Sequence, residues 1–256
     1  TMSLSSPADA QNSLTFDAAV RNTYAPSSVG EVTPLPGGQH FARLSPDGKQ
    51  VLRYDFQTGK QDGVLFDVAQ IEDCPFETVE GYVVSPDGSK MLLRTATRKG
   101  FRRSMTATYY IYIIGNSTVA PLSDGGPQEC PVFSQDGNLV AFVREGNIFL
   151  IKLLFNNSES QVTKDGAPGQ VLNGKPDWVY EEEFAATSGL CFSPDGQMIC
   201  WIRWDESAVG TYSFPLYAGA APEMPQYAEY PGIYNLKYPK AGTPNSRVSV
   251  LSYDIK

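Results

Sequence analysis

The chain has 256 residues, of which 41% are hydrophobic and 19% charged, and its formal net charge is −8. This length fits one or two domains with a sizeable core. The negative charge argues against nucleic acid or an anionic membrane as a partner, because phosphate binding needs clustered Lys and Arg. No stretch approaches the ~20 apolar residues that span a bilayer, and the first residues lack the apolar core of a secretory signal.

One pattern occurs four times: apolar residues, Ser, Pro or Gln, Asp-Gly, two variable positions and a second apolar run. The copies span residues 43–54, 83–94, 132–143 and 191–202. Each copy is typical of two strands joined by a tight turn. Asp-Gly turns are common, so unrelated hairpins of a sandwich are the alternative, but four copies that share Ser, Asp and Gly in register favour a true repeat. The copies are spaced close to or above the ~40–50 residues of a propeller blade. The sequence therefore predicts an all-β fold, a β-propeller with four-stranded blades, over residues 31–256, after a lead-in segment at 1–30.

Two insertions lie between the copies and carry opposite charges. Residues 95–106 include several Lys and Arg, and residues 171–187 include the run Glu181, Glu182 and Glu183. Insertions in repeat folds project from one face and often carry binding. Neighbouring carboxylates suit a protonated amine, which has three N–H donors, and a nearby Arg suits a carbonyl or carboxylate oxygen. The two insertions together could bind a peptide by its free N-terminus, although a charge run alone is more often a solvated surface.

The four cysteines lack the spacing of a zinc site or a disulfide scaffold, so we expect no metal and no cofactor. Cys191 and Cys200 bracket the last repeat, and a two-residue turn would place them opposite each other. Pro194 and Gly196 instead favour a type I turn followed by a bulge. That register places Ile199 opposite Cys191, so we expect two buried thiols rather than a bridge.

Several stretches go beyond these patterns. "KPDWVYEEEF" (175–184), "LCFSPDGQMICWIRWDES" (190–207), "YPKAG" (238–242) and "FRRSMTATYYIY" (101–112) resemble the N-terminal propeller region of dipeptidyl peptidase IV, in the prolyl oligopeptidase family of serine peptidases. The resemblance covers nearly the whole chain, and its most specific part is "DWVYEEE". It implies about half of an eight-bladed propeller.

The resemblance also assigns roles to residues of the two insertions. Glu182 and Glu183 match the pair that binds the free α-amine of the substrate, and Glu181 matches a position that supports this pair. Arg102, rather than Arg103, matches the arginine that contacts the carbonyl of the second substrate residue. The parent protein is then expected to release N-terminal dipeptides with Pro or Ala in second position.

The chain departs from the full family pattern in one respect. It contains no G-x-S-x-G nucleophile elbow, and its single histidine, His40, is expected to be structural. The α/β-hydrolase domain with the catalytic triad is therefore expected to be a missing C-terminal partner, and this chain alone is expected to be inactive. The resemblance further implies a secreted, periplasmic or membrane-anchored extracytoplasmic parent, and a possible homodimer.

Two other functions are compatible with the sequence. One is a non-catalytic propeller that binds peptides or proteins, with the acidic run as part of its docking surface. The other is a relative whose hydrolase domain is missing or inactive. A downstream G-x-S-x-G motif followed by Asp and His would distinguish the peptidase from both.

Overall fold

The computed structural model describes residues 14–26, 30–219 and 224–256. The chain divides into two units, Thr1–Val32 and Thr33–Lys256. In the first unit, the short helix α1 (Phe16–Val20) begins after Thr15, whose hydroxyl accepts a hydrogen bond from the backbone N–H of Ala18 at 3.1 Å. The expected lead-in segment, residues 1–30, falls in this unit, but its residues 1–13 and 27–29 lie outside the described residues.

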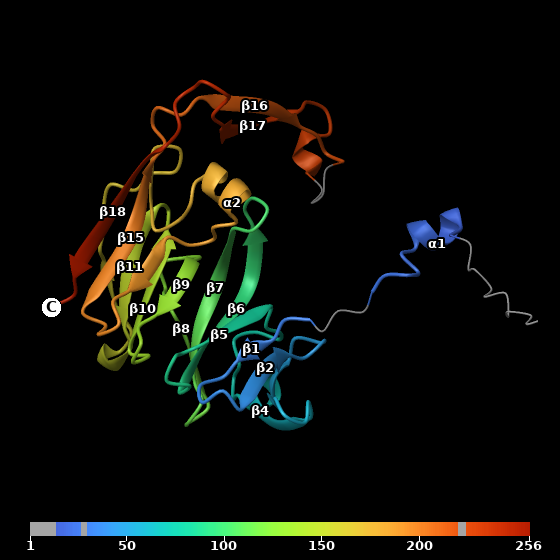
Figure 1. Ribbon diagram of the computed structural model, residues 1–256, viewed down its shortest axis with the longest axis vertical. Coiled ribbons are helices and arrows are strands. Elements are labelled where there is room, and N and C mark those ends of the chain that lie inside the picture. Colours follow the sequence, from blue (N-terminus) through green and yellow to red (C-terminus); the bar gives the residue numbers. More distant parts are fainter. Residues whose placement is uncertain (1–13, 27–29, 220–223) are drawn as a thin grey trace, which may run out of the picture. The chain divides into compact units, whose positions relative to one another are not determined.

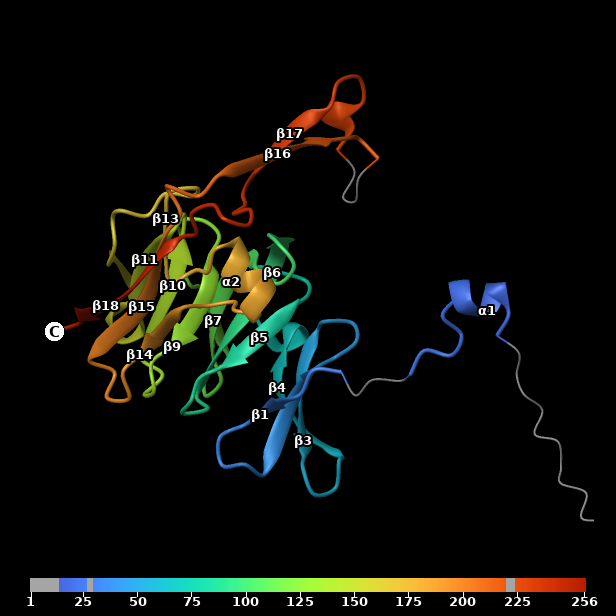
Figure 2. The same ribbon diagram turned by 45° about the horizontal axis from the view of Figure 1, so that its top comes forward.

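The second unit consists of antiparallel sheets that follow one another along the chain (Figures 1 and 2). The first sheet contains β1 (Thr33–Pro34), β2 (His40–Leu44), β3 (Gln50–Asp55) and β4 (Gln61–Asp67). The second contains β5 (Gly81–Val84), β6 (Lys90–Lys99), β7 (Met105–Ile113) and β8 (Thr118–Pro121). The third contains β9 (Glu129–Phe133), β10 (Leu139–Arg144), β11 (Asn147–Lys152) and β12 (Ser158–Gln161). These three four-stranded sheets confirm the predicted all-β fold.

The fourth sheet is built differently. Its strand β15 (Met198–Asp205) pairs on one edge with both β13 (Val171–Asn173) and β14 (Leu190–Phe192), and on the other edge with β18 (Arg247–Asp254). Between β15 and β18 the chain forms a separate two-stranded ladder of β16 (Thr211–Leu216) and β17 (Gly232–Lys237), which projects from the sheets (Figure 2). The remaining elements are α2 (Trp178–Phe184) and three short 3₁₀ turns: Val68–Gln70, Leu153–Phe155 and Pro225–Tyr227.

Alternating apolar residues hold the sheets face to face. In β6, Met91 and Leu93 pack against the first sheet, whereas Leu92 between them packs against the third. In β10, Phe142 faces the second sheet and Ala141 faces the fourth. Successive side chains of a strand point to opposite faces, so the middle sheets are apolar on both. Burying a side chain such as Phe142 contributes about 1.5–3 kcal/mol.

The four repeats form the same turn. In each copy the Ser hydroxyl donates to the Asp carboxylate, at 2.6 Å in Ser45–Asp47, 2.5 Å in Ser85–Asp87, 2.6 Å in Ser134–Asp136 and 2.6 Å in Ser193–Asp195. The Asp also accepts the backbone N–H two residues later, and the Gly that follows it has φ between +67° and +71°. Glycine tolerates this left-handed conformation without steric cost. The shared sequence thus encodes one hairpin four times.

The predicted register of the last repeat is wrong. Cys191 lies opposite Cys200, and Phe192 lies opposite Ile199. In a bulged turn the Gln197 N–H would pair with the opposite strand. Here this N–H donates instead to the Asp195 carboxylate at 3.0 Å. Ser193 therefore pairs with Met198. Both cysteines are free, but Cys191 is exposed and Cys200 half-buried, so the expectation of two buried thiols is also wrong.

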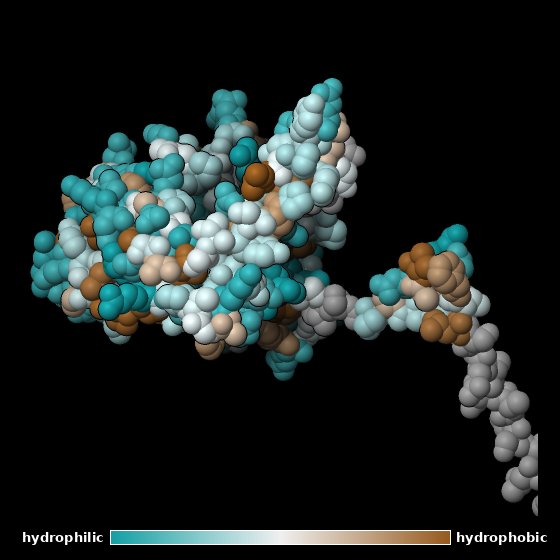
Figure 3. Space-filling view, turned by 90° about the horizontal axis from the view of Figure 1, so that it is seen from above, coloured by the Kyte–Doolittle hydropathy of each residue, from teal (hydrophilic) through white to brown (hydrophobic). Residues whose placement is uncertain are grey.

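Over the described ranges, no helix has the length and apolar character needed to cross a bilayer. Seen from above, the molecule presents a mostly hydrophilic surface with scattered apolar side chains (Figure 3).

Candidate functional site

The acidic run lies on α2, in an excursion that interrupts one edge of the fourth sheet. β13 ends at Asn173 and β14 begins at Leu190, and the two ends of the excursion meet where Gly189 N–H donates to Gly174 C=O at 2.9 Å. A Cβ atom at position 189 would lie 2.4 Å from the ring of Trp204. Glycine is therefore required at 189 for the chain to return so close to the sheet.

Aromatic packing and a cap fix α2 on the sheet. The Asp177 carboxylate accepts from the Tyr180 N–H at 2.9 Å and from the Ser246 hydroxyl at 2.5 Å. Tyr180 meets Trp204 edge-on, with ring centroids 5.4 Å apart. An Asp at the N-cap satisfies an N–H that has no partner inside the helix, and the ring contact buries the inner face of the first turn.

Glu181 connects α2 to the tip of the basic insertion. Its side chain is buried, with 1% exposure, and one carboxylate oxygen accepts the backbone N–H groups of Arg103 at 2.6 Å and Ser104 at 2.8 Å. Hydrogen bonds to an ionised acceptor are stronger than neutral ones. Glu181 thereby holds the tip between β6 and β7 against the helix.

Arg102, at the same tip, binds Glu182 with two parallel contacts. Its Nε donates to Oε2 at 2.9 Å, and its Nη2 lies 2.7 Å from Oε1. The hydrogen bond to Glu182, and after it the carboxylate charge, raise the pKa of the Arg102 guanidinium. The pair is solvent-accessible, because 66% of the Arg102 side chain and 26% of the Glu182 side chain are exposed.

Glu183 points elsewhere. It is exposed and lines a separate hollow with Tyr180, Phe184, Asn245 and Ser246. Of the four residues predicted from the sequence, the structure thus brings Arg102, Glu181 and Glu182 together and places Glu183 on the next position of the helix.

Both legs of the excursion are tied to the third sheet. Lys175 forms an ion pair with the buried Glu129 of β9, and the Cys130 thiol donates to the Thr187 carbonyl at 2.9 Å. Burial, and to a lesser degree the charge of Glu129, raise the pKa of Cys130 to about 12. This thiol therefore stays protonated and serves as a hydrogen-bond donor.

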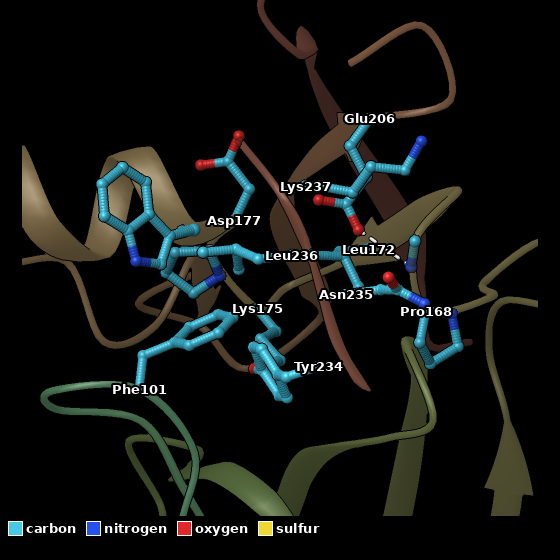
Figure 4. A pocket seen from close by; sticks show the side chains of 13 residues that line it. Phe101, Pro168, Leu172, Lys175, Asp177, Glu206, Tyr234, Asn235, Leu236 and Lys237 are labelled. Atoms are coloured by element: carbon cyan, nitrogen blue, oxygen red, sulfur yellow. Dashed lines mark hydrogen bonds between the residues drawn. The ribbon is translucent and has the colours of Figure 1, made fainter. Parts of the chain in front are cut away.

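A cavity lies between the tip, the start of α2 and strand β17 (Figure 4). Phe101 from the tip and Tyr234 from β17 face it, together with Asp177 and Glu206. Glu206 accepts the Gly169 N–H at 2.9 Å. Burial is the main cause that raises the pKa of Glu206, and the charge of Asp177 adds to it.

Asp177, Ser104 and Lys175 were missed in the sequence. Asp177 carries a usable signal, because Asp directly before a helix is typical of an N-cap. Ser104 takes part through its backbone N–H, for which the side chain gives no sign. Lys175 pairs with a residue of another sheet, which only the tertiary structure reveals.

Comparisons with known proteins agree with this architecture. The family model described as "Dipeptidyl peptidase IV (DPP IV) N-terminal region" matches residues 85–256. A probable dipeptidyl-aminopeptidase B of Aspergillus niger is 33% identical over 82% of this chain and 25% of its own length. Dipeptidyl aminopeptidase B of Saccharomyces cerevisiae is 33% identical over 70% of this chain and 21% of its own length.

Solved structures extend the agreement to three dimensions. Porphyromonas gingivalis dipeptidyl peptidase 4 matches 94% of this chain with a TM-score of 0.87 and 37% identity, and 33% of that chain is covered. A putative dipeptidyl aminopeptidase IV from Bacteroides ovatus matches 88% of this chain and 29% of its own length, with a TM-score of 0.56 and 19% identity, which shows the fold alone. The chain thus spans about a quarter of the curated relatives quoted above. With its sheets now recognised as propeller blades, it belongs to the dipeptidyl peptidase IV N-terminal region family.

Proposed function

We propose that this chain is the substrate-recognition part of a serine dipeptidyl peptidase that releases N-terminal dipeptides with Pro or Ala in second position. In this proposal Glu182 and Glu183 bind the free α-amine of the peptide, and Arg102 binds the carbonyl oxygen of its second residue. The hydrolase domain of the longer parent protein supplies the nucleophile, so this chain binds peptides without cleaving them.

The contact between Arg102 and Glu182 carries the proposal. Two insertions that lie 80 residues apart in sequence meet at this pair, and Glu181 fixes the backbone beside it. The N-terminus of a peptide carries an ammonium group and, next to it, carbonyl oxygens. The Glu182 carboxylate is suited to the ammonium, and the adjacent Arg102 guanidinium is suited to a carbonyl oxygen.

The pair has unused hydrogen-bonding capacity. A carboxylate offers about four lone-pair sites and a guanidinium five N–H donors. The two contacts between Arg102 and Glu182 leave acceptor sites on the carboxylate and donors on the guanidinium. An ammonium group can therefore bind Glu182 while Arg102 donates to a peptide carbonyl, and the exposed Glu183 can turn toward the same ammonium.

Calorimetric titration of the 256-residue chain with Ala-Pro-Ala tests the proposal. The free peptide is expected to bind at least about tenfold more tightly than its N-acetylated form, a difference of about 1.4 kcal/mol. Glu182→Gln is expected to remove this preference. The matched control is Glu229→Gln, at an exposed position with no assigned role.

Two outcomes would contradict the proposal. Equal affinity for free and acetylated peptide would show that the carboxylates do not read the amine and would favour a general interaction surface. In the longer parent, dipeptide release that is unchanged by both Glu182→Gln and Glu183→Gln would remove these residues from the site.

We also propose that the parent acts outside the cytoplasm, by secretion, export to a periplasm or a membrane anchor. Peptides with free N-termini and a C-terminal α/β-hydrolase domain would be its partners. Detection of the parent only in the cytoplasmic fraction of its source cells would contradict this location.

A further inference from the structure

The connection that carries Arg102 is longer than its counterpart in the next sheet. The last pair of the β6–β7 ladder is Lys99 with Met105, so residues 100–104 form the tip. In the third sheet the corresponding strands, β10 and β11, are joined by residues 145–146 alone. Two-residue hairpin turns take a few defined geometries, whereas a five-residue tip needs hydrogen bonds of its own to keep one conformation.

Ser104 supplies the inner hydrogen bonds of this tip. Its carbonyl oxygen accepts the backbone N–H of Gly100 at 2.8 Å, and its hydroxyl oxygen accepts the backbone N–H of Phe101 at 3.0 Å. The residue is buried, with 9% exposure. A Cβ atom at position 100 would lie 2.6 Å from this hydroxyl oxygen and would displace it. The tip is therefore closed tightly around the Ser104 hydroxyl.

The two neighbours of Arg102 are held by different groups. The N–H of Arg103, which follows it, donates to Glu181. The N–H of Phe101, which precedes it, donates to the Ser104 hydroxyl. Loss of the hydroxyl would therefore release the chain on the N-terminal side of Arg102, while Glu181 still held the C-terminal side.

The contact between Arg102 and Glu182 is sensitive to such a release. Two parallel contacts, at 2.9 Å and 2.7 Å, require the guanidinium to lie in line with the carboxylate. Because 66% of the Arg102 side chain is exposed, packing does little to hold it, and its direction depends on the backbone of the tip. A misplacement of about 1 Å in a positioned group can lower catalysis about 100-fold.

We propose that the Ser104 hydroxyl is a positioning group for Arg102. By holding the Phe101 N–H, it directs the guanidinium toward Glu182 and leaves the remaining N–H donors available to the carbonyl oxygen of a bound peptide. The statement about the peptide rests on the proposed function. The statement about the contact between Arg102 and Glu182 does not depend on it.

Three variants isolate the hydroxyl. Ser104→Ala removes the acceptor, Gly100→Ala displaces it with a methyl group, and Ser104→Thr keeps a hydroxyl at the same position. The matched control is Ser45→Ala, because Ser45 has the same 9% exposure and its hydroxyl accepts the backbone N–H of Gln50 at 2.9 Å in the first sheet. Similar losses of stability are expected in Ser104→Ala and Ser45→Ala, but only the first should affect Arg102.

The first measurement is nuclear magnetic resonance of the 256-residue chain without peptide. The Arg102 Nε–H, which donates to Glu182, is expected to exchange with solvent several-fold faster in Ser104→Ala and Gly100→Ala than in the wild type. Ser104→Thr and Ser45→Ala should exchange at the wild-type rate. An unchanged rate in folded Ser104→Ala or Gly100→Ala would overturn the inference.

The second measurement is a double-mutant cycle in calorimetry with Ala-Pro-Ala. Ser104→Ala is expected to weaken binding of the free peptide several-fold in the wild-type background and to have little further effect in Arg102→Ala, because the hydroxyl acts through Arg102. An equal loss in both backgrounds would overturn the inference, since Ser104 would then act by another route. A wild-type chain that binds free and acetylated peptide equally would contradict the proposed function, and the exchange rate of the Arg102 Nε–H would still decide the role of Ser104.

Discussion

Glu181 is a buried carboxylate whose hydrogen-bond partners are two backbone N–H groups. Burial of a charge is costly unless hydrogen bonds replace its water, and the N–H groups of Arg103 and Ser104 supply them. The residue contributes no exposed charge to the candidate site. It acts on the site through the position that it gives to Arg102.

Glu181→Gln is expected to lower the free energy of unfolding by about 1–3 kcal/mol, because the neutral amide accepts more weakly and its NH₂ group is buried without a partner. Chemical denaturation followed by tryptophan fluorescence measures this loss. Glu229→Gln, at an exposed position, is the control and is expected to stay within about 0.5 kcal/mol of wild type. An unchanged stability in Glu181→Gln would show that the tip holds its position without this residue.

Arg102→Lys is expected to separate binding from stability. Exposed ion pairs contribute little to folding, so the free energy of unfolding should stay close to that of the wild type. Lys cannot make the two parallel contacts that Arg makes, and the affinity for a peptide with a free N-terminus should fall several-fold in calorimetry. Affinity equal to wild type would leave only the positive charge of Arg102 as relevant.

At the scale of elements, the hairpin repeat was readable in the sequence but its register was not. Ser, Asp and Gly at fixed spacing indicate a turn in all four copies. The register depends on which acceptor takes the N–H of the residue after Gly, and Gln197 donates to a side chain rather than to the strand. A rule based on backbone turn types alone misses such a bond.

Because of the Asp carboxylates in these turns, we expect the stability of the fold to decrease in acid. The hydrogen bond from Ser134, and then those from Asn138, lower the pKa of Asp136 from its ordinary value. A carboxyl whose pKa is lowered in the folded state stabilises the fold above its unfolded pKa of about 3.9. That contribution is lost as the pH falls through the lower, folded value.

Asp136→Asn keeps the acceptor oxygen but does not titrate. Its loss of stability relative to wild type is therefore expected to be larger at about pH 6 than at about pH 2.5. Urea unfolding at the two pH values measures the difference. Asp124→Asn serves as the control, because this side chain is exposed and makes no hydrogen bond within the described residues. A pH-independent effect of Asp136→Asn would assign the turn's stability to neutral hydrogen bonds.

A side chain at position 189 is expected to clash with Trp204 at the stem of the excursion. Gly189→Ala places a methyl group 2.4 Å from the Trp204 ring, so we expect a destabilisation of about 1–3 kcal/mol from overpacking. Gly115→Ala is the matched control, because no atom lies within 4 Å of its added Cβ. Thermal unfolding compares the two variants. Equal stability would mean that Trp204 moves aside at no cost.

For the whole molecule, the outer edge of β18 is the feature with the clearest consequence. All its residues are exposed, Val250 by 76%, and its inner edge alone is paired among the described strands. Unpaired edges invite pairing with another chain. We therefore propose that this chain self-associates at high concentration, in line with the homodimer expected from its family.

Val250→Lys is expected to reduce this association, since a Lys on an edge strand disfavours edge pairing. Light scattering across a concentration series measures the effect. Ile233→Lys, on the β16–β17 ladder, is the comparison and should leave edge pairing intact. Association that survives Val250→Lys but is lost in Ile233→Lys would assign the interface to that ladder instead.

The all-β architecture could be predicted because one local hairpin pattern repeats along the chain, and the family could be predicted because stretches such as "DWVYEEE" resemble it. The candidate site could be predicted only in part. The residue types of Arg102, Glu181 and Glu182 suggested a charged site, but their separate contacts follow from how α2 packs on Trp204 and from the length of the β6–β7 tip. Glu183 illustrates the limit, because one step along a helix turns a side chain by about 100°.

The closed stem of the α2 excursion has a consequence for how such a protein can change. A backbone hydrogen bond between Gly174 and Gly189 closes the base of this excursion. The segment between the two glycines can therefore be replaced as a unit while β13 and β14 stay paired with β15. New ligand preferences can then evolve, or be engineered, by grafting a different helix between two fixed glycines.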